Sequence, residues 1–453
     1  MTSYEEFFKG KKITQVGLGL LGRGVGDARF LARMGAELTV TDLKTPKELE
    51  ASLDALKEFK NIHYTLGRHD MADFRDRDLV INGAAVPLDS PYIAEARANG
   101  IPVTMSTALF ARFARGMGTT LLGITGTRGK STTTEMIVAI AKAAGANVLL
   151  GGNIRGVSTL AQLLEVAPGT LSILELDSWQ LQGFRDEHTS PTIAVFTNLY
   201  PDHLNYYKGD MDAYLFDKAQ IFLNQHQEDT LVLGSQVAPI VEHAYASRMM
   251  SRVVVASAED LPSDWKLTIL GVHNRANAAC ALAAARALKI DDSVSRTALE
   301  RFMGVEGRLQ FVREIHGVNI YNDNSATTPE ATIAGLRAVG SQSKRNVVLI
   351  MGGDDKSLDM SELIAEIPKW CSKVVLFKER GTDRIRDQVL ALVSDGLVVY
   401  ETQGLPATVG RAVSIAEPGE VILFSPAFSS FGKWFTNEHD RGDQFLALIK
   451  QLT

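Results

Sequence analysis

The chain has 453 residues, a formal net charge of −6, 45% apolar residues and 22% charged residues. This length exceeds one ordinary hydrophobic core, so we expect two to four domains. The acidic balance argues against a nucleic-acid partner, and the lack of a signal-peptide pattern or long apolar run predicts a cytoplasmic protein without a membrane span. Cys280 and Cys371 stand in no pairing or metal-binding motif, so neither a disulfide nor a zinc site is expected.

The first segment, residues 1–107, reads as a small doubly wound α/β unit. A strand over residues 12–16 leads into Gly17-Leu18-Gly-Leu-Leu-Gly22, a helix follows, and a second strand ends at Asp42. This is the βαβ fingerprint of dinucleotide-binding units, with Asp42 near the position that contacts a ribose. Because a helix N-terminus holds any nucleotide diphosphate, the fingerprint leaves open NAD, another nucleotide, or a ligand-free turn.

The second segment, residues 108–305, carries the strongest motif. An apolar strand over residues 121–125 leads into a glycine-spaced loop and then a helix that begins with Lys130, Ser131 and Thr132. Such a loop and helix start predict a phosphate site, in which Lys130 reaches the terminal phosphates and a hydroxyl of Ser131 or Thr132 binds Mg²⁺. Ile124 stands where a standard phosphate loop has its first glycine. The expected ATP contacts within the loop are Gly126, Thr127, Arg128, Gly129, Lys130, Ser131 and Thr132.

Other polar residues follow the strands of this segment. Glu175, on a strand over residues 171–176, is interpreted as a Mg²⁺ ligand, with an exposed edge acid as the alternative. His203 follows the strand over residues 192–198, where α/β sheets bind ligands, and we expect metal or phosphate contact. Asn153 either contacts a polar edge of a ligand or belongs to a glycine turn at the end of a strand. Lys218, judged from its spacing alone, is most simply a surface lysine.

Two asparagines, Asn274 and Asn277, stand three residues apart at the start of an Ala-rich helix, and they either cap it or contact a purine. The last segment, residues 306–453, again alternates strands and helices, which predicts a third doubly wound, parallel sheet. Gly-rich or polar loops follow two of its strands, at residues 352–357 and 425–430.

Taken together, these motifs resemble the Mur ligase family over nearly the whole chain. The matching runs are Gly126-Thr-Arg-Gly-Lys-Ser131, Gly151-Gly-Asn-Ile154, Leu174-Glu-Leu-Asp-Ser-Trp-Gln-Leu181, Asn198-Leu-Tyr-Pro-Asp-His203, Gly271-Val-His-Asn-Arg-Ala-Asn277, Gly352-Gly-Asp-Asp-Lys-Ser357 and Ser425-Pro-Ala427. The resemblance implies an N-terminal Rossmann-like UDP-binding domain (1–107), a central P-loop ATPase-like domain (108–305) and a C-terminal Rossmann-like domain (306–453).

The resemblance also implies a reaction. ATP would phosphorylate the carboxylate of UDP-N-acetylmuramoyl-L-alanine, and D-glutamate would then attack the acyl phosphate in a step of peptidoglycan synthesis. Two Mg²⁺ ions and a monomeric enzyme are expected, with His203 and a carbamylated Lys218 at the second ion. Further implied contacts are Asn274, Arg308 and Asp323 for ATP; Gly17, Leu18, Asp42 and Asn153 for the UDP-linked substrate; and Lys356 and Ser430 for the amino acid.

Some positions depart from the family pattern. Arg128 replaces a loop asparagine, Gly307 stands where a histidine often precedes Arg308, and Asn324-Ser325 replaces a common Ser-Lys pair, which removes a positive charge near the amino acid. A related ligase that uses another amino acid, including a folylpolyglutamate-type enzyme, is therefore one alternative. A second is an NAD-dependent oxidoreductase with a P-loop module, favoured only by the first glycine loop.

Overall fold

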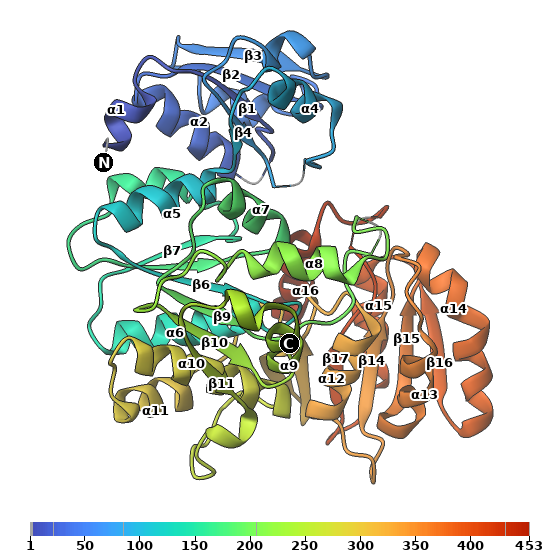
Figure 1. The fold of residues 1–453 in the computed structure, drawn as a ribbon. Helices are drawn as coiled ribbons and strands as arrows, with labels where there is room; N and C mark the ends of the chain where they lie inside the picture. Colours follow the sequence, from blue (N-terminus) through green and yellow to red (C-terminus); the bar gives the residue numbers. More distant parts are fainter. Residues whose placement is uncertain (1–2, 21, 85, 205, 431, 453) are drawn as a thin grey trace. The chain divides into compact units, whose positions relative to one another are not determined.

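The computed structural model describes residues 3–20, 22–84, 86–204, 206–430 and 432–452. Leu21 of the first glycine loop is outside these ranges. The chain contains three sheets and divides into two compact units. The first unit comprises residues 1–262 and 276–298, and the second comprises residues 263–275 and 299–453. Figure 1 shows the three sheets, coloured from blue to red along the chain.

The first sheet has the strand order β3-β2-β1-β4-β5, and its strands are parallel. Its strands are β1 (Lys12–Val16), β2 (Glu37–Asp42), β3 (Ile62–Leu66), β4 (Leu79–Asn82) and β5 (Val103–Thr104). Its helices are α1 (Tyr4–Phe8), α2 (Arg23–Arg33), α3 (Glu50–Asp54), η1 (Met71–Phe74) and α4 (Pro91–Ala98). Gly35 follows α2 with a φ of 79°, the left-handed conformation that commonly ends a helix. The predicted βαβ fingerprint is therefore confirmed.

The second sheet is also parallel, with the order β11-β10-β9-β6-β8-β7. Its strands are β6 (Thr120–Thr125), β7 (Val148–Gly152), β8 (Leu171–Glu175), β9 (Ile193–Phe196), β10 (Thr230–Gly234) and β11 (Arg252–Ala256). The surrounding helices are α5 (Ser106–Gly116), α6 (Lys130–Ala143), η2 (Leu160–Leu164), α7 (Ser178–Asp186), α8 (Met211–Ala219), α9 (Ala238–Tyr245), η3 (Ala246–Arg248), η4 (Ala258–Asp260), α10 (Val272–Ala287) and α11 (Asp292–Glu300). The central position of β6 places the loop that follows it in the middle of the sheet edge.

One hydrophobic core joins the first two sheets. Leu38 and Val40 of β2, Phe110 of α5, and Leu121 and Phe196 of the second sheet belong to the same cluster of buried side chains. The two sheets also meet through Asp27 of α2, which accepts a hydrogen bond from the Ser158 hydroxyl (2.6 Å). These contacts explain why two of the three predicted α/β domains form one compact unit.

The third sheet has the order β12-β13-β17-β14-β15-β16. Its strands are β12 (Gln310–Ile315), β13 (Val318–Asn322), β14 (Val347–Met351), β15 (Cys371–Phe377), β16 (Val398–Thr402) and β17 (Val421–Phe424). Its helices are α12 (Pro329–Val339), α13 (Ser361–Trp370), α14 (Arg380–Ala391), η5 (Leu392–Asp395), α15 (Leu405–Ile415) and α16 (Glu438–Gln451). The expected all-parallel sheet is wrong at one edge: β12 pairs antiparallel with β13, because only the tight turn at His316 and Gly317 joins them.

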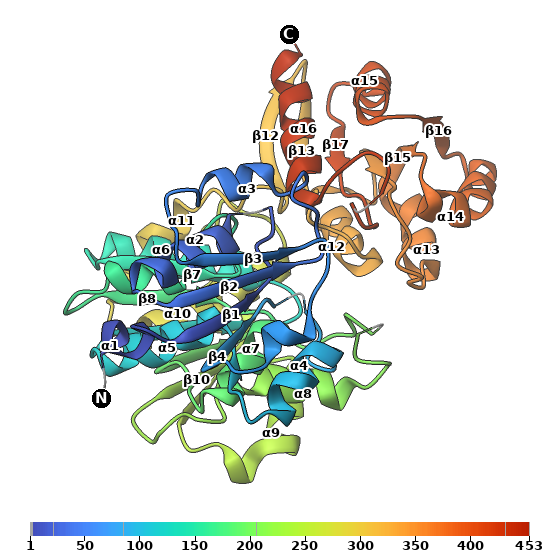
Figure 2. The same cartoon turned by 90° about the horizontal axis from the view of Figure 1, so that it is seen from above.

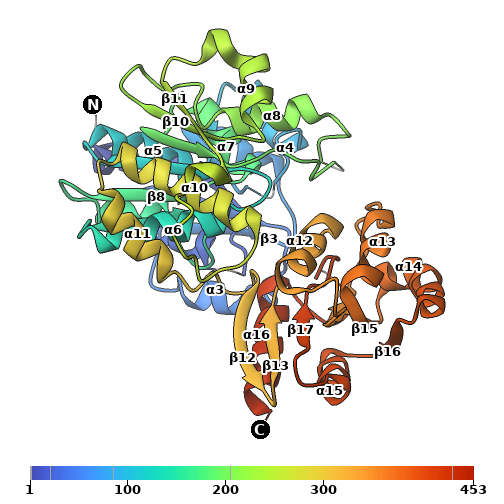
Figure 3. The same cartoon turned by 90° about the horizontal axis from the view of Figure 1, so that it is seen from below.

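Helices cover both faces of the third sheet. Helices α12, α13 and α14 contribute to one buried cluster, whereas α15 and α16 contribute to another that contains Phe424, Phe445 and Ile449. Figure 2 and Figure 3 show the two sets of helices on opposite sides of the strands. Cys280 and Cys371 are free thiols buried in the protein, as expected. Among the described residues, no helix is long and apolar enough to cross a bilayer.

Candidate active site

The glycine-rich loop between β6 and α6 is shaped by its two spaced glycines. Gly126 has a φ of 148°, and Gly129, the residue before the helix, has a φ of 76°. A Cβ atom at Gly126 would collide with the Thr197 side chain, and one at Gly129 would collide with Asn277 of α10. Glycine is therefore needed at both positions for backbone conformation and for space.

The same loop is held by the strand beside it. Asn198, which follows β9, accepts hydrogen bonds from the Thr127 N–H (2.9 Å) and the Arg128 N–H (2.8 Å). The Lys130 ammonium folds back to donate to the Gly126 carbonyl oxygen (3.0 Å). The N–H groups in the first turn of α6 point out of the positive end of the helix. The arrangement is an anion site with a lysine beside it.

Lys218 lies under this loop rather than on the surface, so the surface interpretation is wrong. Its side chain is 1% exposed, and its ammonium donates to the Gly126 carbonyl oxygen (3.0 Å) while standing 4.8 Å from the centre of the Tyr214 ring. Burial lowers the pKa of Lys218 well below its ordinary value, and the positive charge of Lys130 lowers it further. A buried amine of this kind is disposed to be neutral and nucleophilic.

His203 lies close to the same loop. Its ring packs against Trp179, with 4.7 Å between ring centres, and its backbone is left-handed with a φ of 53°. Burial lowers the pKa of His203, Asp202 opposes that shift, and Lys130 and Lys218 add to it. A neutral imidazole is the form that binds metal ions. The structure thus brings Lys130, Lys218 and His203 together.

Two acids at this site were not singled out from the sequence. Asp202 accepts a hydrogen bond from the Arg128 guanidinium (3.2 Å), and Asp177 caps α7 by accepting from the Gln180 N–H (2.7 Å). Both carboxylates raise the pKa values of His203 and Lys218, so their charge reaches both groups. The available signal was position, because Asp177 is two residues past the end of β8 and Asp202 is six residues past the end of β9.

Glu175 ends β8 with its side chain 3% exposed, so it is not an exposed edge acid. Its carbonyl oxygen accepts a hydrogen bond from the Asn153 N–H (2.6 Å), and a Cβ at Gly152 would collide with its backbone. Among the described residues, no three His, Cys, Asp or Glu side chains converge to hold a metal ion alone. Mg²⁺ commonly takes one or two protein carboxylates together with phosphate oxygens and water.

The first glycine loop, between β1 and α2, has a different partner. Asp42 accepts hydrogen bonds from the N–H groups of Leu18 (2.9 Å) and Gly19 (3.0 Å). Burial would raise the pKa of Asp42, but these N–H groups and that of Lys44 hold it below its ordinary value. Gly17 has a φ of 91°, which favours glycine. The Asp42 carboxylate therefore binds the loop between β1 and α2, and its predicted contact with the UDP-linked substrate stays a prediction.

Three predicted nucleotide contacts lie in the second compact unit. Asn274 is buried and donates to the Leu270 carbonyl oxygen (2.7 Å). Asp323, which follows β13, accepts from the Ser425 hydroxyl (2.8 Å) and the Leu309 N–H (2.9 Å). Burial raises the pKa of Asp323 to about 7, against the opposing hydrogen bonds and the positive charge of Arg308, the third predicted contact.

The two predicted amino-acid contacts follow neighbouring strands of the third sheet. Lys356 comes after β14 and donates to the Thr327 hydroxyl (3.0 Å), and Ser430, 3% exposed, comes after β17. Since β13, β17 and β14 are adjacent and parallel, Asp323, Ser430 and Lys356 follow the same edge of one sheet. Ligands in open α/β sheets bind at such an edge.

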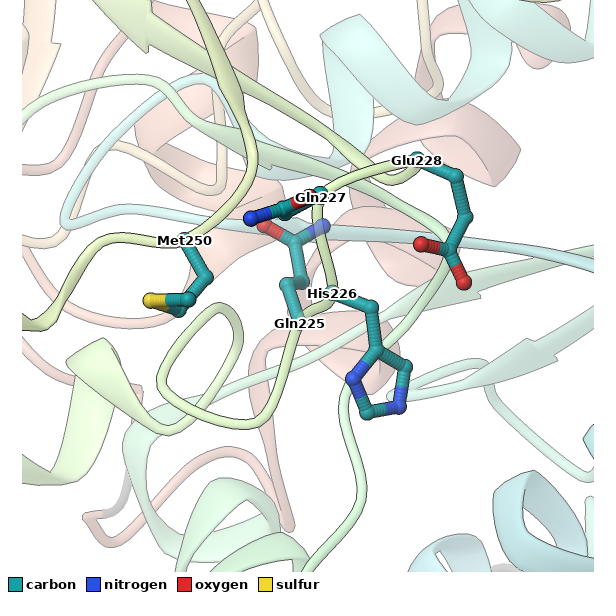
Figure 4. A pocket seen from close by; sticks show the side chains of 5 residues that line it. All are labelled: Gln225, His226, Gln227, Glu228 and Met250. Atoms are coloured by element: carbon teal, nitrogen blue, oxygen red, sulfur yellow. The ribbon is translucent and has the colours of Figure 1, made fainter.

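Two cavities lie elsewhere. One of about 500 Å³, shown in Figure 4, is lined by Gln225, His226, Gln227, Glu228 and Met250, none of which was predicted as a site residue. The Gln225 amide there is committed to the carbonyl oxygens of Pro191 and Thr230, so it serves its own loop. The other, of about 420 Å³, lies between the start of α10 and helix α12 and is lined by His273, the neighbour of Asn274. Burial lowers the pKa of His273, which favours a neutral ring there.

Comparison with family models gives one match for each sheet. Residues 11–105 match the Mur ligase MurD-like N-terminal domain, residues 124–258 match the Mur ligase middle domain, and residues 307–428 match the Mur ligase glutamate ligase domain. The exact domain boundaries 1–107, 108–305 and 306–453 stay predictions.

Similar proteins extend over almost the whole chain. A protein of Roseiflexus sp. named UDP-N-acetylmuramoylalanine--D-glutamate ligase is 36% identical over 98% of this chain and 99% of its own length. A Borreliella burgdorferi protein with the same name is 35% identical over 96% of this chain and 97% of its own length.

A solved structure supports the same fold. The structure of UDP-N-acetylmuramate-alanine ligase from Thermotoga maritima aligns with a TM-score of 0.61 at 21% identity, covering 97% of this chain and 99% of that one. At this identity the likeness concerns the fold alone. The family models and the full-length relatives carry the assignment: the chain belongs to the Mur ligase family and is an ATP-dependent ligase.

Proposed function

We propose that this enzyme joins D-glutamate to UDP-N-acetylmuramoyl-L-alanine in peptidoglycan synthesis. ATP transfers its γ-phosphoryl group to the substrate carboxylate, giving an acyl phosphate and ADP. The amine of D-glutamate then attacks the acyl carbon, loses a proton and releases phosphate, leaving an amide. The observation that carries the proposal is the similarity, over 98% of the chain, to a relative named for this reaction. We expect the enzyme to act in the cytoplasm as a monomer.

The loop before α6 supports the phosphoryl-transfer step. The N–H groups at the start of α6, together with the Lys130 ammonium, would hold the β- and γ-phosphates where negative charge develops. The loop residues Gly126 to Gly129 would enclose the phosphates, and Arg128, hydrogen-bonded to Asp202, would add positive charge at the loop. In the second compact unit, Asn274 and Asp323 are proposed as nucleoside contacts and Arg308 as a phosphate contact.

The donor set beside the loop fits Mg²⁺. Ser131 or Thr132 in the first turn of α6, together with the buried Glu175, supplies the hydroxyl and carboxylate oxygens that one ion prefers. His203, with its lowered pKa, would hold a second ion. Bound Mg²⁺ would neutralise charge on the phosphates during transfer.

Lys218 is proposed to carry a carbamate. Its neutral amine would add to CO₂ with loss of one proton, which turns a buried cation into an anion close to His203. Burial and the neighbouring Lys130, which lower the pKa of Lys218, favour the nucleophilic form of the amine that this addition requires.

The remaining site residues are proposed to bind the other two substrates. Gly17 and Leu18, the Asp42 carboxylate that binds their loop, and Asn153 after β7 are assigned to the UDP-linked substrate. Asn153 accepts a hydrogen bond from the Arg23 guanidinium at the start of α2 (3.1 Å), so the two parts of the first unit meet there. Lys356 and Ser430 are assigned to the carboxylates of the amino acid.

A related ligase with a different amino acid is the second candidate. Ser325 stands where the family often has lysine. Its N–H donates a hydrogen bond to the Gly307 carbonyl oxygen (2.8 Å). The third-domain site therefore lacks one cation of the common pattern, and the amino acid must be found by assay. An NAD-dependent oxidoreductase is disfavoured, because the family assignment accounts for the first glycine loop.

The test is phosphate release from ATP with UDP-N-acetylmuramoyl-L-alanine and a series of amino acids. Release that depends on D-glutamate, with formation of the amide product by mass spectrometry, supports the proposal. Release with another amino acid, such as L-glutamate or L-alanine, would assign the second candidate. The absence of release with every amino acid would overturn both, and reduction of NAD would restore the oxidoreductase.

We expect Lys218→Ala to lose at least about 10²-fold in turnover and to be partly rescued by a small added carboxylate, which would replace the carbamate charge. The matched control is Lys208→Ala, which alters an exposed lysine preceding α8 and should keep normal turnover. Intact-mass measurement of the native protein should show an added 44 Da, the mass of CO₂. Full activity of Lys218→Ala without rescue would contradict the assignment.

A further inference from the structure

A buried arginine contacts the loops that carry the substrate residues of the third domain. Arg441 belongs to the first turn of α16, and its side chain is 1% exposed, which places it among the largest fully buried side chains. Burying a guanidinium is costly unless it is hydrogen-bonded, and a cation near the positive end of a helix gains nothing from the helix dipole. Helix stability therefore does not explain its position.

The contacts of Arg441 explain it better. Its Nε donates to the Asn324 side-chain oxygen (2.9 Å), and its Nη2 donates to the Asn324 carbonyl oxygen (2.8 Å). Its Nη1 donates to the Phe428 carbonyl oxygen (3.2 Å). A Cβ built on Gly353 would stand 3.4 Å from the same Nη1. One planar guanidinium thus lies where the loops after β13, β17 and β14 meet.

These three loops carry the residues assigned to substrates in the third domain. Asp323 precedes Asn324, Ser430 is two residues after Phe428, and Lys356 follows Gly353 by three residues. The loops are also bonded directly to one another. Ala427 donates to the Ala326 carbonyl oxygen (2.9 Å), and Asp354 exchanges two backbone hydrogen bonds with Ser429 (3.0 and 3.2 Å). Arg441 is therefore the side-chain component of a rigid platform.

We propose that Arg441 is a positioning residue for the amino-acid substrate. Its guanidinium ties the Phe428 loop to the Asn324 loop and lies against Gly353, so that Ser430 and Lys356 are held at the spacing that the bound amino acid requires. A guanidinium has several donors in one plane, and lysine, with a single ammonium, cannot bond both loops with the same geometry. The proposal rests on the assignment of the third domain to the amino acid under Proposed function.

The experiment compares Arg441→Lys with the wild type in the phosphate-release assay, varying one substrate at a time. We expect the KM for the amino acid to rise at least about 10-fold, while the KM values for ATP and for the UDP-linked substrate change less than about 2-fold. A purely structural role would lower the melting temperature, or the active fraction, without selecting one substrate.

Arg313→Lys is the matched control. Arg313 also donates to a backbone carbonyl oxygen, that of Leu452 (3.2 Å). Leu452 lies at the other end of α16, away from the strand-end loops that Arg441 contacts. It should leave the KM for the amino acid within about 2-fold of the wild type. If both variants raise that KM equally, docking of α16 rather than the Arg441 contacts is responsible, and the proposal is overturned.

Asn324→Ala is a second variant, and it keeps the proposal testable if Arg441→Lys does not fold. It removes the side-chain acceptor of Arg441 and should raise the same KM by about 3-fold to 10-fold. An unchanged KM for the amino acid in whichever of these two variants folds would overturn the proposal. A wild-type enzyme that releases no phosphate with any amino acid would instead overturn the proposed function, so the two failures are distinguishable.

Discussion

The loop between β1 and α2 and the loop between β6 and α6 share one backbone plan. They differ in the side chains that bind them. Each leads from a parallel strand through glycines into a helix whose preceding residue is a left-handed glycine, Gly22 before α2 and Gly129 before α6. In the first loop, the Asp42 carboxylate binds the N–H groups of Leu18 and Gly19. In the second, Asn198 and the cation of Lys130 hold the loop.

The difference bears on the ligands. In the first loop, the Asp42 carboxylate weakens the attraction of the Leu18 and Gly19 N–H groups for a further anion. A loop with a lysine beside the N–H groups of a helix start attracts concentrated negative charge, such as that of a triphosphate. The same backbone plan therefore gives two different electrostatic environments, which are set by the neighbouring side chains.

Removing the cation of the second loop should have the largest effect. We expect Lys130→Ala to lower turnover at least about 10²-fold, equivalent to about 2.7 kcal/mol, because charge stabilisation of the transferring phosphoryl group is lost. Steady-state phosphate release measures it. Lys142→Ala, an exposed lysine in the last turn of α6, is the control and should behave as the wild type. A near-normal rate for Lys130→Ala would remove Lys130 from the site.

A glycine-to-alanine substitution should destabilise the two loops to different degrees, because Gly126 is crowded and Gly19 lies in open space. Gly126→Ala would strain a φ of 148° and collide with Thr197, so we expect it to lower the free energy of unfolding by about 2 kcal/mol. Gly19→Ala strains a φ of 66° in open space and should cost about 1 kcal/mol. Urea unfolding of both variants measures the difference, and equal losses would show that crowding does not distinguish the loops.

The smallest expected effect is on the free energy of unfolding at acidic pH, through Asp42. The folded-state pKa of Asp42 lies below its ordinary value of about 3.9, so its stabilising contribution is present above that pH and is lost as pH falls through the lower folded value. We expect Asp42→Asn to be less stable by about 1 kcal/mol at neutral pH and to lose less stability on acidification.

Urea unfolding from pH 6 down to pH 3 tests this. The control is Glu58→Gln, an exposed acid of the same domain, which should follow the wild-type pH dependence. An Asp42→Asn variant whose stability falls as steeply as that of the wild type would show that Asp42 is not the acid-sensitive partner of the first loop.

Local sequence was sufficient for the strand–loop–helix units. The glycine spacing, apolar strands and helix starts of both loops were predicted, because each is encoded within about 30 consecutive residues. The strands β10 and β11 were not assigned, although the β-branched run over residues 252–256 is a usable signal. The antiparallel edge strand β12 depends on a turn at Gly317, whose direction the apolar pattern does not contain.

Side-chain environments were harder to predict because they depend on distant segments. The spacing of α8 suggested a surface position for Lys218, whereas the packing of α8 beneath the loop after β6 buries it. Asp42 was predicted as a substrate contact, but its hydrogen bond to Leu18, 24 residues earlier in the chain, was not predicted. Arg441 gave no local signal, since its acceptors lie 117 and 13 residues away.

The contact between Gly129 and Asn277 has a consequence for synthesis on the ribosome. The first compact unit closes only with residues 276–298, which follow its last strand, and the Asn277 side chain packs directly over the glycine that begins α6. Chains fold from the N-terminus as they emerge. The loop at residues 126–129 therefore gains its contact with Asn277 only after about 150 further residues have been synthesised. The strands of the third sheet are made soon afterwards.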